Sequence, residues 1–356
     1  MHCRNAIYKC GYYSELINYE KKPTDRIQLF KIRLSRLGAY VLHFKKYYTL
    51  FINKSNAVAR ERLFEEFYRK YALIGKTRYE SIEDLNNNPP QYELYIVGSD
   101  QTWSPSISEQ KEKEVFFLSF VPEGSVKGSY APSIGLSRIK EQEKELFKKY
   151  LDDFKYLSCR EKTGSQILSE VLGKDVVNVL DPTLLLEEDE WLQMADGKII
   201  EEPYILEYFL GNRIEHRGFV KKLSRQTGLK IVSLPFDSLD MADTSVERLY
   251  VGPAQFLRLI HDAEYVCTDS FHGSVFSVIF KTKFFSFCKH SDYSAQSENS
   301  RLYDFLDSIH LNDRIVMDYR SSPSLSINFD ESARYLKKLR EVSWDYLVYM
   351  LDQELR

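Results

Sequence analysis

Short apolar runs alternate with longer amphipathic segments along most of the chain. In the first half, the runs that we predict to be strands are 14–20, 93–99, 126–131, 154–160 and 175–181. Between them, residues 137–154 and 163–173 have the spacing of amphipathic helices. Ser137 is placed to cap the first of these helices and Gly173 to end the second. This alternation predicts parallel strands covered by helices on both faces.

The second half repeats the same order of elements. Its predicted strands are 203–210, 229–234, 264–268 and 283–287. We expect helices at 212–228 and at 252–263, where Pro253 suits the first helical turn, and an amphipathic helix near the end of the chain. The pattern predicts an α/β fold of two Rossmann-like, doubly wound domains that face a cleft.

The length of the chain supports this division. A chain of 356 residues exceeds the size at which one core usually stops growing. We expect an N-terminal domain at 1–182, a C-terminal domain at 183–325, and a helix at 326–356 that packs back on the N-terminal domain.

The segment 26–72 breaks the alternation, because it is basic and aromatic together. Leu63, Phe64 and Phe67 have helical spacing within it. A basic amphipathic helix can lie on an anionic membrane surface, which would give the chain a peripheral membrane contact. A solvated helix packed on the domain edge is the preferred alternative, because charge runs usually mark solvent faces.

Composition narrows the class of protein. The chain is 43% hydrophobic and 28% charged, as globular domains are, and its net charge of −3 argues against nucleic acid as the main partner. Its five cysteines are scattered and form no CxxC pair, which argues against a disulfide framework or a zinc knuckle. The sequence has neither an apolar signal region nor an apolar stretch that could span a bilayer. We expect a cytoplasmic protein, free or at the inner membrane face.

The stretch 264–287 places polar side chains where a predicted strand passes into a helix. Asp269, Ser270 and His272 lie in this turn, and Gly273 follows them at the start of the helix. In open α/β sheets, ligands bind at the carboxyl ends of strands, where the next helix offers unpaired N–H groups. An imidazole there can transfer a proton to or from a bound anion. A helix cap formed by Asp269 or Ser270, with His272 filling space, explains this stretch equally well.

Polar residues also follow other predicted strands. Those of the first half are Asp100, Ser133, Arg160 and Asp181. Several such strand ends that meet at one crevice are harder to explain as caps than a single one, so we expect a ligand site there. For Asp100, an Asx-turn or a cap remains an equal alternative. Asp181 is followed by Pro182 and can act by shaping the turn between the domains.

The motifs GSDQTW, SYAPSIG, SCREKTG, DPTLLL and TDSFHGSVFSVIF occur in this order between about residue 12 and about residue 310. In this combination they resemble the polysaccharide pyruvyl transferase family. The resemblance implies a fold similar to that of the GT-B glycosyltransferases, with the active site in the cleft. It also implies the reaction, in which a pyruvyl group moves from phosphoenolpyruvate to two sugar hydroxyls. The products are a cyclic ketal and phosphate, and no separate cofactor is expected.

The resemblance assigns roles to individual residues. His272 matches the family histidine and is the expected proton donor or acceptor, while Asp100 and Asp269 are candidates to orient the acceptor or to act as bases. Arg160 matches the family arginine and is expected to bind the anionic donor, for which a guanidinium is well shaped. The further candidates for donor binding are Ser133, Lys162, Ser270, Gly273 and Arg301.

Two features depart from the family pattern. Many relatives carry an arginine where this chain has Ser270, so another cation must bind the phosphate or the donor must differ. Lys162 and Arg301 are weaker candidates, because solvent exposure also explains both. Relatives usually begin with a strand and a Gly-rich loop, whereas residues 2–20 match the helix end and strand that follow these. Either the true start of the chain lies upstream, or the N-terminal domain lacks that strand and loop, which would leave an open sheet edge.

Three functions remain open at the level of the sequence. The leading hypothesis is pyruvyl transfer to a lipid-linked or polymeric glycan. The second is a GT-B-like glycosyltransferase that uses a nucleotide sugar, although no Gly-rich nucleotide loop stands out. The third is a binding relative that has lost catalysis. Binding of phosphoenolpyruvate would separate the first hypothesis from the other two.

Overall fold

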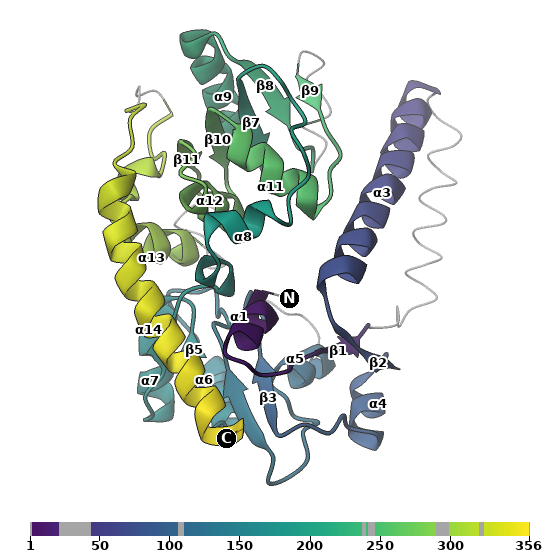
Figure 1. Cartoon of the computed structure of the whole chain (residues 1–356), viewed down its shortest axis with the longest axis vertical. Coiled ribbons are helices and arrows are strands. Elements are labelled where there is room, and N and C mark those ends of the chain that lie inside the picture. The colour runs from purple at the N-terminus through teal and green to yellow at the C-terminus, as the bar shows by residue number, and fades with distance from the viewer. Residues whose placement is uncertain are drawn as a thin grey trace.

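The computed structural model describes residues 2–20, 44–105, 110–236, 240, 246–289, 299–319 and 324–355. Its elements form two lobes, one above the other in Figure 1, and the long helix α14 (Phe329–Leu355) runs along both. All described strand pairs are parallel. The expected α/β class with parallel sheets is therefore confirmed.

The strands of the first lobe pair two by two. The pairs are β1 (Leu16–Tyr19) with β2 (Ile74–Tyr79), β3 (Leu94–Val97) with β4 (Val126–Ser129), and β5 (Ser158–Cys159) with β6 (Val177–Asn178). In the described part of the chain, no strand pairs with the other edge of β1 or of β3. Every residue of β1 is only partly buried, as is typical of a strand near an open edge.

The helices of the first lobe are α1 (His2–Lys9), α4 (Ile82–Asn87), α5 (Gln110–Phe116), α6 (Glu141–Leu151) and α7 (Lys162–Leu172). A further helix, α3 (Phe44–Tyr71), lies in the connection between β1 and β2. Gly173 ends α7 in the left-handed conformation, as predicted. The predicted cap at Ser137 is wrong, because Lys140 is the residue that precedes α6. Its backbone N–H donates to the Glu143 carboxylate at 2.6 Å, which fixes the helix start three residues later than the sequence suggests.

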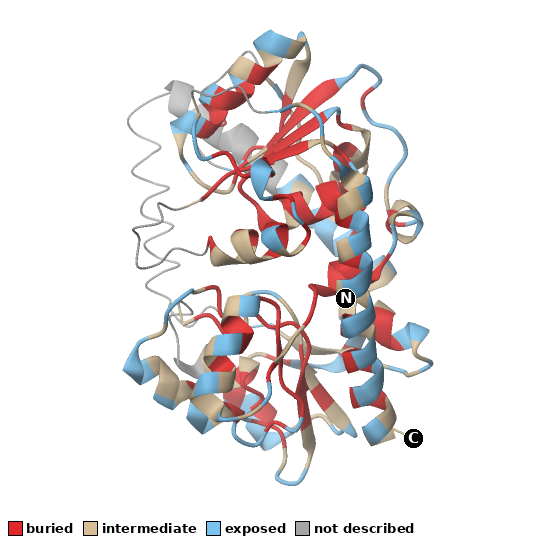
Figure 2. Cartoon of the chain, turned by 90° about the vertical axis from the view of Figure 1, so that its left-hand side faces the viewer, coloured by how far each residue is buried: buried red, intermediate tan, exposed pale blue. Residues whose placement is uncertain are grey.

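The second lobe has a parallel sheet in the order β11–β10–β7–β8–β9. Its strands are β7 (Tyr204–Tyr208), β8 (Lys230–Ser233), β9 (Glu247–Arg248), β10 (Tyr265–Thr268) and β11 (Phe284–Ser286). Its helices are η1 (Pro182–Leu185), α8 (Glu188–Leu192), α9 (Ile214–Thr227), α11 (Pro253–Asp262), α12 (Phe271–Ile279), α13 (Ser300–Ser308) and η2 (Asn312–Arg314). Pro253 is the first residue of α11, as predicted. Strand β10, which lies between β11 and β7, is buried along its whole length, and Figure 2 shows strands of this lobe in red.

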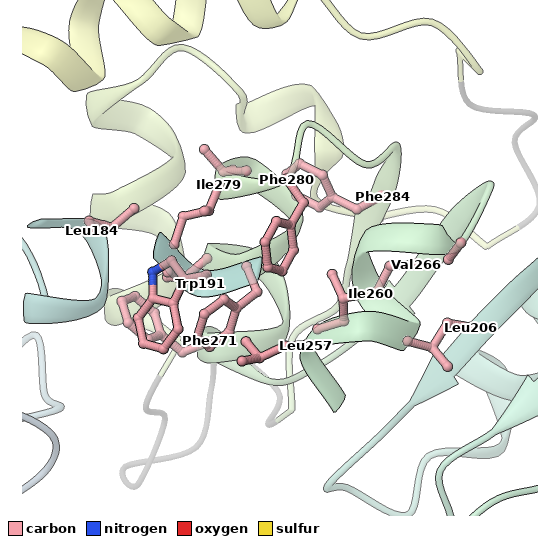
Figure 3. Packing of buried hydrophobic residues seen from close by; sticks show 14 of the residues in the cluster. Leu184, Trp191, Leu206, Leu257, Ile260, Val266, Phe271, Ile279, Phe280 and Phe284 are labelled. Carbon is pink, nitrogen blue, oxygen red and sulfur yellow. The ribbon is translucent and has the colours of Figure 1, made fainter. Parts of the chain in front are cut away.

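An apolar cluster surrounds α12 and links it to the elements that follow the first lobe. Phe271 and Ile279 of α12 lie in this cluster with Leu184 of η1 and Trp191 of α8 (Figure 3). The indole Nε1 of Trp191 donates to the Thr183 carbonyl at 3.1 Å. The start of the second lobe is therefore packed directly against the helix that carries the predicted site histidine.

The turn between β10 and α12 depends on one glycine. A Cβ atom at Gly273 would lie only 2.6 Å from Thr268 Oγ1, so a larger residue cannot fit while the helix lies this close to the strand. Ser270 caps the helix, since its Oγ accepts a hydrogen bond from the Gly273 N–H at 3.3 Å. This tight turn holds His272 at the carboxyl end of the sheet.

Helix α14 contacts both lobes. Leu336 packs in the core of the second lobe, and Met350 packs in a cluster of the first lobe that includes Tyr130. The Tyr346 hydroxyl donates to the Ser129 carbonyl at 2.9 Å. These contacts place the end of the chain on the first lobe, while the expected domain boundaries stay predictions.

Helix α3 connects β1 and β2 of the first lobe but packs on the second lobe. Phe67 is buried in the core cluster of the second lobe, and Leu63 lies against Gly252 at the start of α11. Phe64, by contrast, is 41% exposed. Burial of Phe67 supports a helix packed on the domain edge, and membrane contact stays a prediction, since residues 26–43 lie outside the described residues. None of the described helices combines the length and the apolar character that crossing a membrane requires.

Candidate functional site

Strand ends from both lobes meet around the carboxylate of Asp181. Arg160 follows β5, Asp181 follows β6, and His272 lies in the first turn of α12. The Arg160 Nη1 donates to Asp181 Oδ2 at 2.8 Å, and His272 Nε2 lies 3.6 Å from the same oxygen. One carboxylate therefore joins a guanidinium of the first lobe to an imidazole of the second.

Asp181 is buried but remains negatively charged. Burial raises the pKa of its carboxyl, yet the hydrogen bond and charge of His272, together with Arg160, outweigh burial and hold this pKa well below its usual range. Thr183 donates to Oδ1 twice, from its N–H at 3.0 Å and from its hydroxyl at 2.8 Å. A carboxylate held in this way can orient the imidazole without taking its proton.

The guanidinium of Arg160 is surrounded by acidic groups. Its side chain is 3% exposed, with Glu161 at 3.2 Å from Nε and Asp100 at 3.6 Å from Nη2, in addition to Asp181. The guanidinium also lies over the Phe271 ring of the second lobe, 4.4 Å from its centroid. With three acidic neighbours, this cation has little charge left to attract an anionic donor. The geometry favours a positioning role for Arg160 over the donor-binding role expected from the sequence.

Asp100 stands at the end of β3 in a strained backbone conformation. Its φ is +70°, which is uncommon for a residue other than glycine and is enriched at functional sites. The Ser133 N–H stabilises this conformation by donating to the Asp100 carbonyl at 2.7 Å. The Asp100 side chain is 62% exposed, and its carboxylate lies 4.0 Å from Arg301 Nη1. Asp100 can therefore reach a ligand, whereas Ser133 is fully buried and supports the loop.

A shallow hollow that opens to solvent, with a cavity volume of about 30 Å³, lies where the two lobes meet. Among the residues that line it are Arg160, Lys162, Asp181, Phe271, Arg301 and Asp304. A second hollow, with a cavity volume of about 20 Å³, shares Phe271 and Arg301 with the first and adds Asp269 and Lys289. The structure thus brings Lys162 and Arg301 to one cavity, together with Arg160.

Three further residues predicted for the site form the turn beneath it. Asp269 Oδ1 accepts the Leu210 N–H at 2.6 Å, and Oδ2 accepts the Gly211 N–H at 2.9 Å, so this carboxylate fixes the turn after β7. Burial raises its pKa, although these two N–H groups oppose the change. Ser270 and Gly273 form the cap of α12 described above. This geometry favours structural roles for the three residues.

Sequence reasoning missed Asp304 and Lys289 as cavity residues. It placed Asp181 at a strand end of the expected ligand site, with shaping of the turn as the alternative role. Phe271 lies in the motif TDSFHGSVFSVIF, next to His272, and Asp304 lies three residues after Arg301. Their spacing alone could have suggested that they share the site. No local signal marked Asp181 as the common partner of two distant residues, because that relation exists only in the folded chain.

His216 of α9 lies buried against Phe209, Phe287 and Tyr319. Neither ring nitrogen has a hydrogen-bond partner among the described residues. Burial, helped by the nearby Arg213, lowers the pKa of His216 from 6.5 to about 3.

The folded chain therefore binds fewer protons at His216 than the unfolded chain between pH 6.5 and about 3. The stability that this group contributes is full above pH 6.5 and is lost as the pH falls toward 3. Between pH 7.5 and pH 5, the unfolding free energy of the wild type should fall by about 2 kcal/mol more than that of His216→Phe. Urea unfolding at both pH values measures this.

The matched control is His310→Asn, since His310 is exposed and asparagine tolerates its positive φ. This control should leave the pH dependence unchanged. Equal pH dependence in the wild type and in His216→Phe would show that the buried ring does not titrate as described.

The sequence model of the polysaccharide pyruvyl transferase family matches residues 2–287, and the chain belongs to this family. Membership implies a transferase whose substrate is a polysaccharide. No curated protein matches the sequence.

A comparison with solved structures gives two proteins to which this chain is similar. A UDP-GlcNAc 2-epimerase from Methanocaldococcus jannaschii, solved with UDP-GlcNAc and UDP, has 14% identity and a TM-score of 0.40, over 72% of this chain and 78% of that one. A functionally uncharacterised protein from Klebsiella pneumoniae has 10% identity and a TM-score of 0.42, over 89% of this chain and 99% of that one.

Proposed function

We propose that this chain transfers a pyruvyl group from phosphoenolpyruvate to two hydroxyls of a glycan sugar, and that it releases phosphate. The acceptor is a lipid-linked or polymeric glycan, in line with the family's substrate class. The observation that carries the proposal is the placement of His272 and its carboxylate partner Asp181 beside a cavity that holds Lys162 and Arg301.

The donor is a small molecule with a carboxylate and a phosphate, so its site needs fixed cations and oriented N–H groups. Because Arg160 is already neutralised by acidic neighbours, we assign donor binding to Arg301 and Lys162 in the first hollow. Lys289 supplies a further cation in the adjoining hollow. These residues replace the charge that relatives carry at the position of Ser270.

Ketal formation requires one proton at the methylene carbon of phosphoenolpyruvate, which makes the adjacent carbon an oxocarbenium-like centre. Attack by two sugar hydroxyls and departure of phosphate then give the ketal, and the two hydroxyl protons leave. His272 is the proton donor in this scheme, because its side chain is 35% exposed and its ring lies 3.6 Å from Asp181, which lines the cavity. Asp100, exposed at the end of β3, accepts a proton from an attacking hydroxyl.

Incubation of the full chain with phosphoenolpyruvate and a panel of glycan fragments tests this proposal. We expect glycan-dependent release of inorganic phosphate together with a new ketal methyl singlet in the proton NMR spectrum of the glycan. Transfer from a nucleotide sugar without use of phosphoenolpyruvate would instead identify a glycosyltransferase. Binding of neither donor would identify a relative without catalysis, and either result would overturn the proposal.

A further inference from the structure

Helix α13 of the second lobe lies against helix α7 of the first (Figure 1). Asp304 of α13 makes the contact: its Oδ2 accepts the Thr163 N–H at 2.8 Å, and its Oδ1 accepts the Thr163 hydroxyl at 3.0 Å. In the described part of the chain, Glu161 at the N-cap of α7 makes no side-chain capping bond, since its carboxylate accepts from Arg160 instead. Asp304 therefore caps, from the second lobe, a helix that belongs to the first.

This cap joins the two cations that we assign to the donor. Lys162 precedes Thr163 in α7, and Arg301 lies one helical turn before Asp304 in α13, so the two cations come from different lobes. Both line the first hollow. The separation of the two cations therefore depends on how α13 lies against α7. One anion can contact both cations only while that separation is held.

Asp304 itself lines the hollow, but its carboxylate is unsuited to bind an anionic donor. A negative charge repels such a ligand, and both oxygens of Asp304 already accept from Thr163. Its neighbour Arg301 lies 4.0 Å from Asp100 at the end of β3, which gives α13 a second contact with the first lobe. Asp304 is thus placed to organise the site rather than to bind the donor.

We propose that Asp304 is a positioning residue for anion binding. By capping α7, it fixes Lys162 of the first lobe at the distance from Arg301 at which one phosphate or carboxylate group reaches both. Identification of this anion as phosphoenolpyruvate rests on the proposed function, whereas the positioning role needs only an anion that both cations contact.

Removal of the Asp304 carboxylate has two opposite effects on anion binding. Loss of a negative charge from the edge of an anion site, taken alone, strengthens the binding of an anion. Loss of the cap releases α7 from α13, so that Lys162 and Arg301 no longer reach the same anion, and this weakens binding. A positioning role predicts that the second effect is the larger one.

Titration calorimetry of the full chain with inorganic phosphate measures which effect is larger. We expect Asp304→Ala to bind phosphate about tenfold more weakly than the wild type. Asp307→Ala is the matched control, because it makes the same charge change on α13 at an exposed position, and it should stay within about twofold of the wild type. Equal affinity in the two variants, or tighter binding by Asp304→Ala, would overturn the inference.

A double substitution separates positioning from a general loss of structure. In the wild-type background, Lys162→Met should weaken phosphate binding about five- to tenfold. In the Asp304→Ala background, the same substitution should weaken it by less than about twofold, because Lys162 no longer shares the anion with Arg301. The same loss in both backgrounds would show that Asp304 supports only the fold, which also contradicts the inference.

A milder pair of variants tests the contact from the side of the first lobe, without a change of charge. Thr163→Val keeps the shape and the N–H donor but lacks the hydroxyl donor, whereas Thr163→Ser keeps both donors. We expect Thr163→Val to weaken phosphate binding about threefold and Thr163→Ser to stay close to the wild type. If both variants bind phosphate as the wild type does, the cap does not position the cations.

The use of inorganic phosphate separates this inference from the proposed function. Absence of phosphate binding to the wild type would overturn the inference, because the two cations would then share no anion. The expected pattern with phosphate, in a chain that makes no ketal from phosphoenolpyruvate, would refute the proposed function and support the positioning role of Asp304.

Discussion

Replacement of His272 by Gln should lower the rate of ketal formation by about 10²- to 10⁴-fold, the usual contribution of a general acid or base. The reason is that glutamine can hydrogen-bond but cannot deliver a proton to the methylene carbon of phosphoenolpyruvate. The His272 side chain is 35% exposed, so the substitution should leave the unfolding free energy within about 1 kcal/mol of the wild type. Phosphate release, measured with a glycan acceptor present, gives the rate.

His261→Gln is the control for this substitution. His261 lies on α11, where it contacts Asp262 at the surface of the second lobe and does not line the cavity. Its replacement should leave turnover unchanged. Retention of wild-type turnover by His272→Gln would remove His272 from the mechanism, whatever the structure of the cavity.

Replacement of Asp181 by Asn should have the largest effect on stability, with a loss of about 3 kcal/mol of unfolding free energy. Asparagine preserves the shape and the acceptor for Thr183, but it removes the negative charge closest to the buried guanidinium of Arg160. It also removes the charge that orients His272. We therefore expect kcat to fall with little change in the KM for phosphoenolpyruvate. Urea unfolding and steady-state kinetics measure the two effects.

Asp100→Asn is the matched control for stability. Asp100 also faces Arg160, but its side chain is 62% exposed and lies farther away, at 3.6 Å. Its replacement should change the unfolding free energy by no more than about 1 kcal/mol. If Asp181→Asn were as stable as Asp100→Asn, the buried ion pair of Arg160 and Asp181 would not stabilise the folded chain as we describe.

Much of the fold could be predicted from the sequence, because most strands are short apolar runs and the helices between them are amphipathic. Strands β2 (Ile74–Tyr79) and β9 (Glu247–Arg248) were missed, because their residues are largely polar. The strand at 264–268 and the helix after it followed from this pattern, and both are present as β10 and α12. The start of α6 could not be predicted from Ser137, because the cap depends on the position of Glu143 relative to Lys140. Helix α3 packs on residues of the second lobe that are distant from it in the sequence. The sequence of α3 alone therefore left both membrane contact and packing on the domain edge open.

The location of the site was easier to predict than the roles of its residues. A polar residue at a strand end indicates the edge of a ligand site. Arg160 and His272 do lie beside the Asp181 carboxylate, and Asp100 lies 3.6 Å from Arg160. Whether a charge is available to a ligand depends on its partners. Arg160 is neutralised by acids from three separate strand ends, and Asp269 is bound to the turn after β7. Neither fact has a local signature in the sequence.

The central claim is that residues of both lobes form one cavity that binds phosphoenolpyruvate. Titration calorimetry with phosphoenolpyruvate, on the wild type and on Arg301→Met, tests it most directly, with Arg258→Met on α11 as the control for a lost surface charge. We predict saturable binding to one site per chain, weakened at least about tenfold by Arg301→Met and unchanged by Arg258→Met. Absence of binding to the wild type, or equal affinity in all three proteins, would contradict the claim.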